Sequence, residues 1–189
     1  TDIGSFHIHS ECHMHLVCQG TFEGVPPDVP GPTLRQTRAL ATRRRLLDVA
    51  TRLFCDDGFS SVTTTGLCAA AGVTRGALYH HFANMTEVME AVFGDIEGQL
   101  VDCVVAGLSG VEPARAQLTA LGPVILDALA ADDRTTRIVF VEAPSALGWS
   151  RWRSLDGGRS LTLIADILRR CADDGDLRDD VDPLLSAQL

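Results

Sequence analysis

The stretch that decides the fold is TTTGLCAAAGVTRGALYHHF, residues 63–82. Gly72 divides it into two short segments, and each segment follows a threonine, which is a favoured helix N-cap. Thr63 or Thr64 would cap the first helix, and Thr74 would cap the second. The expected helices cover 67–71 and 75–81. Two short helices joined at a glycine predict a helix-turn-helix.

A longer amphipathic helix precedes this motif. Between positions 37 and 56 apolar residues recur at three- and four-residue steps, which places one apolar stripe along a helix. The stripe consists of Leu46, Leu47, Ala50, Leu53 and Phe54. Arg43 and Arg44 fall off the stripe, and Asp57-Gly58 is a natural stop. A long helix followed by two short ones predicts a three-helix head over residues 35–84.

The rest of the chain also has helical periodicity. Valine, isoleucine and leucine repeat every four residues after Asn84. Further helices are predicted from Pro113 to Ala131, from Asp132 or Asp133 through Val141 with an interruption at Pro144, and from Leu155 to Ala172. No segment alternates convincingly with period two, so the chain is predicted to be all-α.

Residues 1–34 differ in composition from the rest. Four histidines and two cysteines lie within the first 18 positions, and four prolines follow before residue 33. Imidazole and thiolate groups at short spacing suit zinc or copper, but this spacing matches no structural zinc pattern. We therefore favour a disordered extension over a metal site and expect no metal or cofactor.

Charge divides along the chain. The whole sequence carries a formal net charge of −9, but residues 35–82 hold seven arginines against three acidic residues, a net +4. A basic head on an acidic body favours the approach of one face to phosphates. No apolar run reaches the roughly 20 residues that a membrane-spanning helix needs, and nothing reads as a signal peptide. We expect a cytoplasmic protein without a membrane partner.

Enzyme chemistry has no candidate constellation. The sequence holds no HExxH motif, phosphate loop or nucleophile triad spacing. Cys55, Cys68, Cys103 and Cys171 lie singly on apolar helical faces and are interpreted as small core residues. We expect no enzymatic activity, while a thiol-responsive or metal-responsive regulator remains an alternative.

Residues 63–82, with the preceding LLDVATRLFCDDGFSSVT at 46–63, resemble the DNA-binding head of the TetR family. About 55 residues match closely, and the run GVTRGALYHHF is highly specific. The resemblance implies a helix-turn-helix head followed by a helical ligand-sensing and dimerisation domain at 85–189. It implies a transcriptional regulator, in most cases a repressor, that leaves its operator DNA when a small-molecule effector binds.

The resemblance also implies which residues meet DNA. The start of the second short helix would read bases, with Arg75 able to pair bidentately with guanine. Tyr79, His80 and the first short helix's N-terminus would touch phosphates, with Arg43 and Arg44 reaching the flanking backbone. The predicted contacts are Arg43, Arg44, Thr63, Thr64, Thr74, Arg75, Gly76, Ala77, Tyr79 and His80. Packing of Tyr79 on the first helix, and a solvated face for the arginines, are the alternatives.

Two positions depart from the family pattern. Gly66 stands where an acidic residue would complete a capping box. Met85 stands where members usually place a phosphate-binding lysine. Both departures would weaken DNA affinity without abolishing the fold.

The second half implies an effector site and a dimer. We predict pocket lining by Phe140, Trp149, Trp152 and Ile164, with Arg137 or Glu142 as the polar group. Asp182-Pro183 predicts a further helix start, yet the sequence ends at Leu189. Because two more long helices normally form the family's dimer interface, we expect an incomplete C-terminus. A homodimer is expected if those helices are present, and a fragment without independent activity is the alternative.

Overall fold

The structure, a computed structural model, describes residues 33–156, 158–178, 180–182 and 186, and within these ranges it contains helices and no strand. The all-α prediction is confirmed. The elements are α1 (Leu34–Asp57), a 3-10 turn η1 (Phe59–Ser61), α2 (Thr64–Ala71), α3 (Arg75–His81), α4 (Met85–Gly107), α5 (Ala114–Ala131), α6 (Asp133–Arg137), a π-helical segment η2 (Ile138–Glu142), α7 (Ala143–Leu147), α8 (Trp149–Asp156) and α9 (Arg159–Asp173). The predicted His/Cys segment, the prolines before residue 33 and the helix start at Pro183 lie outside the described residues.

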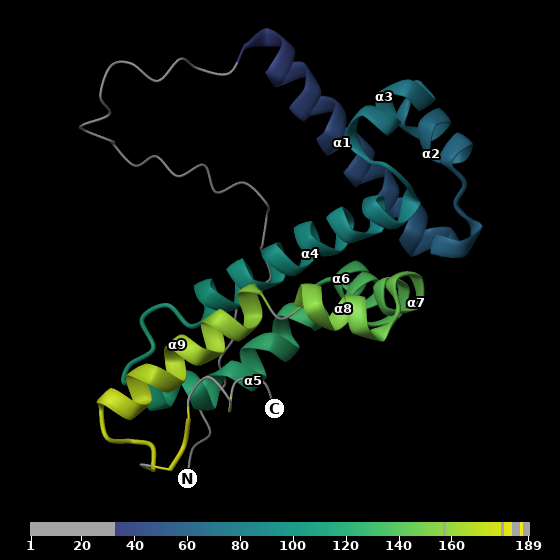
Figure 1. The fold of residues 1–189 in the computed structure, drawn as a ribbon. Helices are drawn as coiled ribbons and strands as arrows, with labels where there is room; N and C mark the ends of the chain where they lie inside the picture. The colour runs from purple at the N-terminus through teal and green to yellow at the C-terminus, as the bar shows by residue number, and fades with distance from the viewer. Residues whose placement is uncertain (1–32, 157, 179, 183–185, 187–189) are drawn as a thin grey trace.

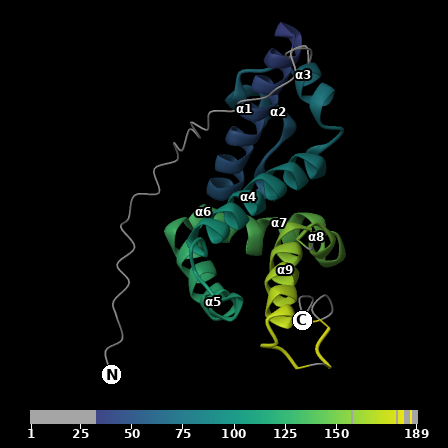
Figure 2. The same cartoon turned by 90° about the vertical axis from the view of Figure 1, so that its left-hand side faces the viewer.

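Two groups of helices lie on opposite sides of α4 (Figure 1). We call α1, η1, α2 and α3 the head. The helices on the other side, α5 to α9 with η2, form the body, and we count α4 with them. In the view turned by 90°, the head stands above α4, whereas α5 and α9 extend side by side below it (Figure 2). Helix α4 contacts both α1 and the body helices, so it connects the two groups. Among the described helices, none has the length and apolar character that crossing a bilayer requires.

Helix α1 has clear sequence signals at both ends. Thr33 and Gln36 form a capping box: the Thr33 hydroxyl accepts from the Gln36 N–H at 3.3 Å, and the Thr33 N–H donates to the Gln36 side chain at 2.8 Å. The helix therefore begins three residues before the predicted position 37. At the other end Gly58 has φ 79°, which L side chains rarely adopt, so the helix stops at Asp57 as predicted.

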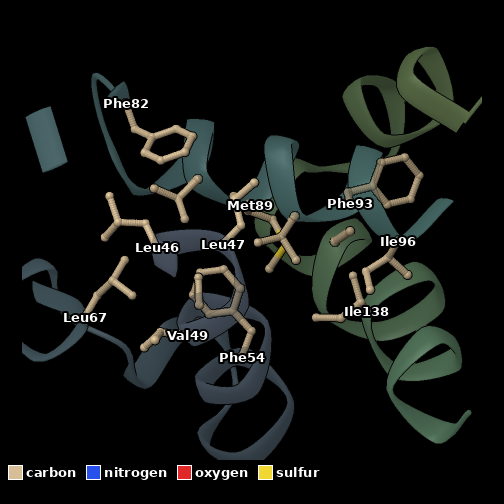
Figure 3. Close-up of a cluster of buried hydrophobic side chains, with 14 of the residues drawn as sticks. Leu46, Leu47, Val49, Phe54, Leu67, Phe82, Met89, Phe93, Ile96 and Ile138 are labelled. Atoms are coloured by element: carbon tan, nitrogen blue, oxygen red, sulfur yellow. The ribbon is translucent and has the colours of Figure 1, made fainter. Parts of the chain in front are cut away.

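One hydrophobic core runs through the head and the upper body. Leu46 and Phe54 of α1 and Leu67 of α2 belong to the same buried cluster as Phe93 of α4 and Ile138 of η2 (Figure 3). The apolar stripe predicted on α1 is confirmed, with Leu46, Leu47, Ala50 and Phe54 buried and Leu53 half-buried. The head therefore shares its apolar interior with the body.

A second buried cluster fills the lower body. Val104 and Leu108 at the end of α4 meet Leu121 of α5 and the pair Ile167 and Cys171 of α9. This cluster lies at the far end of α4 from the head, where α5 and α9 pack together (Figure 2).

The segment from Asp132 to Leu147 does not break at Pro144, so that prediction is wrong. Asp132 caps α6, its carboxylate accepting from the Arg134 N–H at 3.1 Å. The helix then widens into η2, where the Ala143 N–H bonds to the Ile138 carbonyl five residues back. In that register Pro144, which has no N–H, leaves the Val139 carbonyl without its donor.

The indole of Trp152 supplies the missing donor. Its Nε1–H donates to the Val139 carbonyl at 2.9 Å, and the Trp152 side chain is buried. The helical run therefore continues past Pro144, because the Trp152 side chain satisfies the carbonyl to which proline cannot donate. It ends at Leu147.

The predicted single helix from Leu155 to Ala172 is two helices. Leu155 belongs to α8, whereas α9 begins at Arg159 after Gly158. Because glycine is a weak helix former, the glycine pair in the sequence at 157–158 is a natural boundary. The end predicted at Ala172 is confirmed to within one residue, since α9 ends at Asp173 and Gly175 follows with φ 76°.

Candidate nucleic-acid interface

The α2–α3 pair is built by local hydrogen bonds. Thr63, not Thr64, caps α2, its hydroxyl accepting from the Gly66 N–H at 3.1 Å. Gly72 ends α2 in the left-handed conformation, with φ 60° and ψ 40°. Thr74 caps α3 by accepting from the Ala77 N–H at 3.1 Å. The helix-turn-helix predicted from the spacing of these residues is confirmed.

Helix α3 has a buried face and an open face. Leu78 is fully buried, and Phe82 at the end of the helix packs in the same cluster. Arg75, Gly76 and Tyr79 lie on the open face, with Tyr79 48% exposed. His80 is exposed as well, and Ala77 is half-buried. The N-terminal half of α3 therefore offers a polar surface.

Tyr79 connects the two helices at this surface. The Arg75 guanidinium carbon lies 6.0 Å from the centre of the Tyr79 ring. Hydrogen bonds with the Arg75 and Thr64 side chains lower the pKa of Tyr79 below its ordinary value. Its hydroxyl is thus held close to the start of α2, beside the basic group of α3.

Arg43 extends the same surface from α1. Its guanidinium carbon lies 5.1 Å from the centre of the Phe82 ring, a cation–π distance. The pKa of His81 is lowered mainly by burial and further by the neighbouring His80 and Arg43. His81 is therefore a half-buried neutral group at neutral pH, while Arg43 carries the charge at this edge.

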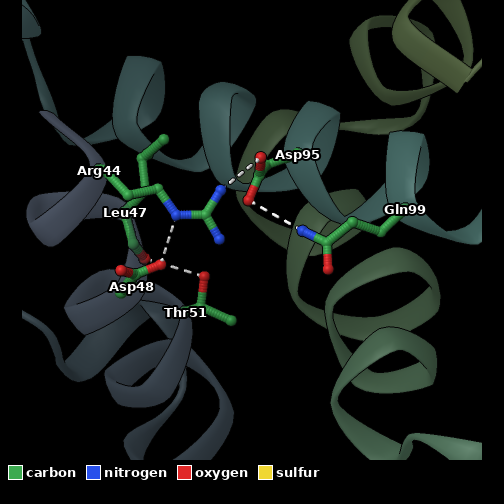
Figure 4. Close-up of polar contacts among 6 residues, drawn as sticks. All are labelled: Arg44, Leu47, Asp48, Thr51, Asp95 and Gln99. Atoms are coloured by element: carbon green, nitrogen blue, oxygen red, sulfur yellow. Dashed lines mark hydrogen bonds and ion pairs between the residues drawn. The ribbon is translucent and has the colours of Figure 1, made fainter. Parts of the chain in front are cut away.

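Arg44 points elsewhere. Its Nε donates to Asp48 at 2.9 Å, and its Nη1 donates to Asp95 of α4 at 3.2 Å (Figure 4). Asp95 also accepts from Gln99 at 3.1 Å. The Arg44 guanidinium is therefore shared between carboxylates on the α4 side of α1, and the structure does not bring it together with Arg43 and Arg75.

Arg45 is a residue that the sequence reasoning missed. Its Nη2 donates to the carbonyl of Gly72 at 3.1 Å, which ties α1 to the turn between α2 and α3. A Cβ atom at Gly72 would lie 2.4 Å from that nitrogen. Only the position of Arg45, one residue beyond Arg44 in a basic run, hinted at this role.

The two departures from the family pattern have structural consequences. Gly66 leaves Thr63 without a reciprocal capping side chain, and only the threonine half of the box forms. Met85 is half-buried against the head's core. At this helix start Asn84 caps α4, accepting from the Glu87 N–H at 2.9 Å, and Glu87 accepts from the Ala83 N–H at 2.5 Å. The first turn of α4 therefore carries an acidic side chain.

The structure places the six predicted pocket residues in different surroundings. Phe140 and Trp149 are 52% and 65% exposed. Trp152 is buried and bonded to Val139, whereas Ile164 packs on the α5–α9 side. Arg137 and Glu142 form an ion pair at 3.2 Å. One shallow cleft of ≈ 310 Å³ on the described surface lies instead on the head, lined by Leu53, Asp57, Ser61, Val62, Thr63 and Gly66.

Of the described cysteines, Cys103 is exposed rather than in the core, whereas Cys55, Cys68 and Cys171 lack the features of a reactive centre. Burial raises the pKa of Cys55, and burial followed by Asp176 and Asp174 raises that of Cys171. Cys68 is buried as well. Because reactive cysteines have lowered pKa values and accessible sulfurs, these three thiols do not favour a thiol-responsive regulator.

The three-helix head, with its capped and exposed α3, defines a helix-turn-helix DNA-binding protein. The family profile described as "Bacterial regulatory proteins, tetR family" matches residues 46–92. The HTH-type transcriptional repressor KstR2 of Rhodococcus jostii (strain RHA1) is 29% identical over 146 residues, covering 74% of this chain and 70% of KstR2. AcrR of Shigella flexneri is 44% identical over 55 residues, which span 29% of this chain and 26% of AcrR.

Structural similarity extends beyond the head. FadR from Bacillus subtilis, solved in complex with stearoyl-CoA, superposes with a TM-score of 0.62 at 19% identity, covering 77% of this chain and 78% of FadR. Residues 46–92 of this chain thus match the TetR family of bacterial regulatory proteins.

Proposed function

We propose that this chain is a transcriptional repressor that binds operator DNA through α3 and leaves it when a small-molecule effector binds the body. The observation that carries the proposal is the open face of α3, where Arg75, Gly76 and Tyr79 lie together on a basic head. A single helix fits the major groove, which is about 12 Å wide.

The contacts divide into two kinds. Thr74, Arg75, Gly76 and Ala77 at the start of α3 read base edges, and the guanidinium of Arg75 pairs with guanine. Thr63, Thr64, Tyr79, His80 and Arg43 position the head on phosphates. Arg44 is less suited to this surface, because its guanidinium already pairs with Asp48 and Asp95.

The protein acts as a regulator rather than an enzyme, and it works in the cytoplasm where operator DNA is found. A homodimer would place two heads on half-sites about 34–36 Å apart, so a small change in head position would end binding. Support for an effector comes from the fold, since the similar FadR structure holds stearoyl-CoA. We assign the effector to the body without naming its cavity.

The test is binding to a duplex from the upstream region of the chain's own gene, measured at several salt concentrations against a scrambled duplex. Arg75→Ala should lose roughly tenfold or more on the upstream duplex and little on the scrambled one, because a good bidentate base contact contributes about 1–3 kcal/mol. Arg43→Ala should weaken both duplexes and lower the salt slope by about 0.9, as expected for one phosphate contact.

Arg169→Ala is the matched control. It makes the same charge change on the exposed face of α9, where Arg169 pairs with Asp166. The proposal fails if Arg169→Ala weakens binding as much as Arg75→Ala does. Weak binding by the wild type that ignores sequence would instead indicate a chain without independent regulatory activity.

A further inference from the structure

A buried carboxylate of the body bonds directly to the backbone of the head. Glu142, in η2, is only 8% exposed. Its Oε2 accepts from the Phe59 N–H at 2.8 Å, although the two residues are 83 positions apart. Phe59 is the first residue of η1, and the preceding Gly58 has no side chain with which to cap it. Glu142 supplies the cap that the local sequence lacks.

The capped turn determines how the DNA-binding pair is attached. η1 joins α1 to α2, and its Phe59 ring packs edge-on against Phe54 with centroids 5.3 Å apart. Thr63, the N-cap of α2, follows two residues after η1 ends. A shift of the Phe59 amide therefore moves the start of α2, to which α3 is fixed by the Gly72 turn.

Glu142 has its position because of the π-helical register. An α-helix advances about 100° per residue, so the wider turn rotates the following side chains relative to a regular helix. The register is held by Pro144 and by the Trp152–Val139 hydrogen bond. Both carboxylate oxygens are engaged, one by Arg137 and the other by Phe59.

This tie, between the head and η2, differs from the Arg44–Asp95 ion pair that links the head to α4. The side chains of Arg44 and Asp95 are 54% and 33% exposed, and solvent-exposed ion pairs contribute little to the free energy of unfolding. Removing Glu142 would leave the half-buried Phe59 N–H without its acceptor. This costs more free energy than the loss of an exposed ion pair.

We propose that Glu142 is the positioning residue through which segment 133–147 holds the head at its angle to the body. Any ligand or partner that returns η2 to a regular α-helical register would rotate the carboxylate off the Phe59 amide and free the head. The part of this inference that concerns DNA rests on the proposed function, whereas the part that concerns head position does not.

The experiment measures the distance distribution between two spin labels on the full chain, one at Thr65 of the head and one at Leu126 of the body. Both positions are exposed, and the labels are attached through unnatural amino acids so that the cysteines stay untouched. The wild type should give one narrow distribution. Glu142→Ala should broaden it or add a second distance.

Two further variants separate the hydrogen bond from the charge. Glu142→Gln keeps an oxygen that accepts from Phe59, so the distribution should stay narrow. Arg137→Ala removes the ion pair alone and should also leave it narrow. Replacing Phe59 by phenyllactate exchanges its N–H for an ester oxygen and leaves both Glu142 and the Phe59 ring in place. It should broaden the distribution as Glu142→Ala does, which decides the matter if Glu142→Ala does not fold.

A folded Glu142→Ala or a phenyllactate variant with the wild-type distribution would overturn the proposal, as would equal broadening by Arg137→Ala. Affinity of the same variants for the upstream duplex should fall roughly tenfold where the distribution broadens, which corresponds to about 1.4 kcal/mol. If the wild type does not bind that duplex, the proposed function fails, while the distance measurement still decides the role of Glu142.

Discussion

Arg43, Arg44 and Arg45 are consecutive in the sequence, yet each makes a different tertiary contact. Arg43 lies over the Phe82 ring, Arg44 pairs with Asp95 of α4, and Arg45 donates to the Gly72 carbonyl. Successive helical residues point about 100° apart, so three neighbours must face three surroundings. The sequence identified a basic run, but the roles of its members depend on what packs around α1.

At the same scale, Gly76 offers a test of close approach to DNA. A Cβ atom there would meet only the Thr74 hydroxyl, at 3.9 Å, so Gly76→Ala has room within the protein. We expect unfolding stability to stay equal or to rise by up to about 1 kcal/mol, because alanine is the better helix former. Affinity for the upstream duplex should fall about tenfold or more, on the scale of one lost base contact.

The control for this prediction is Gly94→Ala, the same change on the exposed side of α4, where nothing lies within 4 Å of the added Cβ. Melting curves and duplex titrations of both variants give the comparison. Unchanged DNA affinity in Gly76→Ala would remove Gly76 from the interface.

At the scale of elements, the turn between α2 and α3 depends on one glycine. Gly72 adopts φ 60°, a conformation that costs an L residue roughly 1–2 kcal/mol. We expect Gly72→Ala to lower the free energy of unfolding by at least that amount, since its Cβ would also displace the Arg45 guanidinium. Urea unfolding provides the measurement.

Gly122→Ala serves as the comparison, because this glycine lies inside α5 with a regular φ and nothing within 4 Å of the added Cβ. It should gain up to about 1 kcal/mol. Equal stability of Gly72→Ala and the wild type would mean that the turn does not need its glycine.

The sequence predicted the elements of the head more accurately than those of the body. The N-cap threonines and Gly72 are local signals, and they act over three or four residues wherever they occur. The course of the chain past Pro144 depends on the Trp152 indole, which lies 13 residues from its partner Val139. No pattern within a single helix contains that information.

At the scale of the whole molecule, the shared core predicts that the head does not unfold alone. Ile138 of η2 is fully buried in the cluster that also holds Leu46 and Phe54 of α1. Ile138→Ala should cost about 2–5 kcal/mol and should speed amide exchange in α1 as well as in α4. Hydrogen exchange read by mass spectrometry resolves the two helices.

The matched variant is Ile167→Ala, an identical deletion in the lower cluster between α5 and α9. Its effect on exchange should be larger in those two helices than in α1. If α1 keeps wild-type protection in a destabilised Ile138→Ala protein, the head is an independent folding unit and the shared core does not couple it to the body.

The sequence by itself determined the all-α class, the helix-turn-helix with its capping threonines and left-handed glycine, and the division of charge between head and body. Each of these follows from local propensity, spacing or composition. The tertiary structure alone decided that Arg44 turns toward α4, that Phe140 and Trp149 face outward, and that Glu142 reaches the Phe59 amide. Those outcomes depend on which side chains meet across distant segments, and packing geometry sets that only once the helices are assembled.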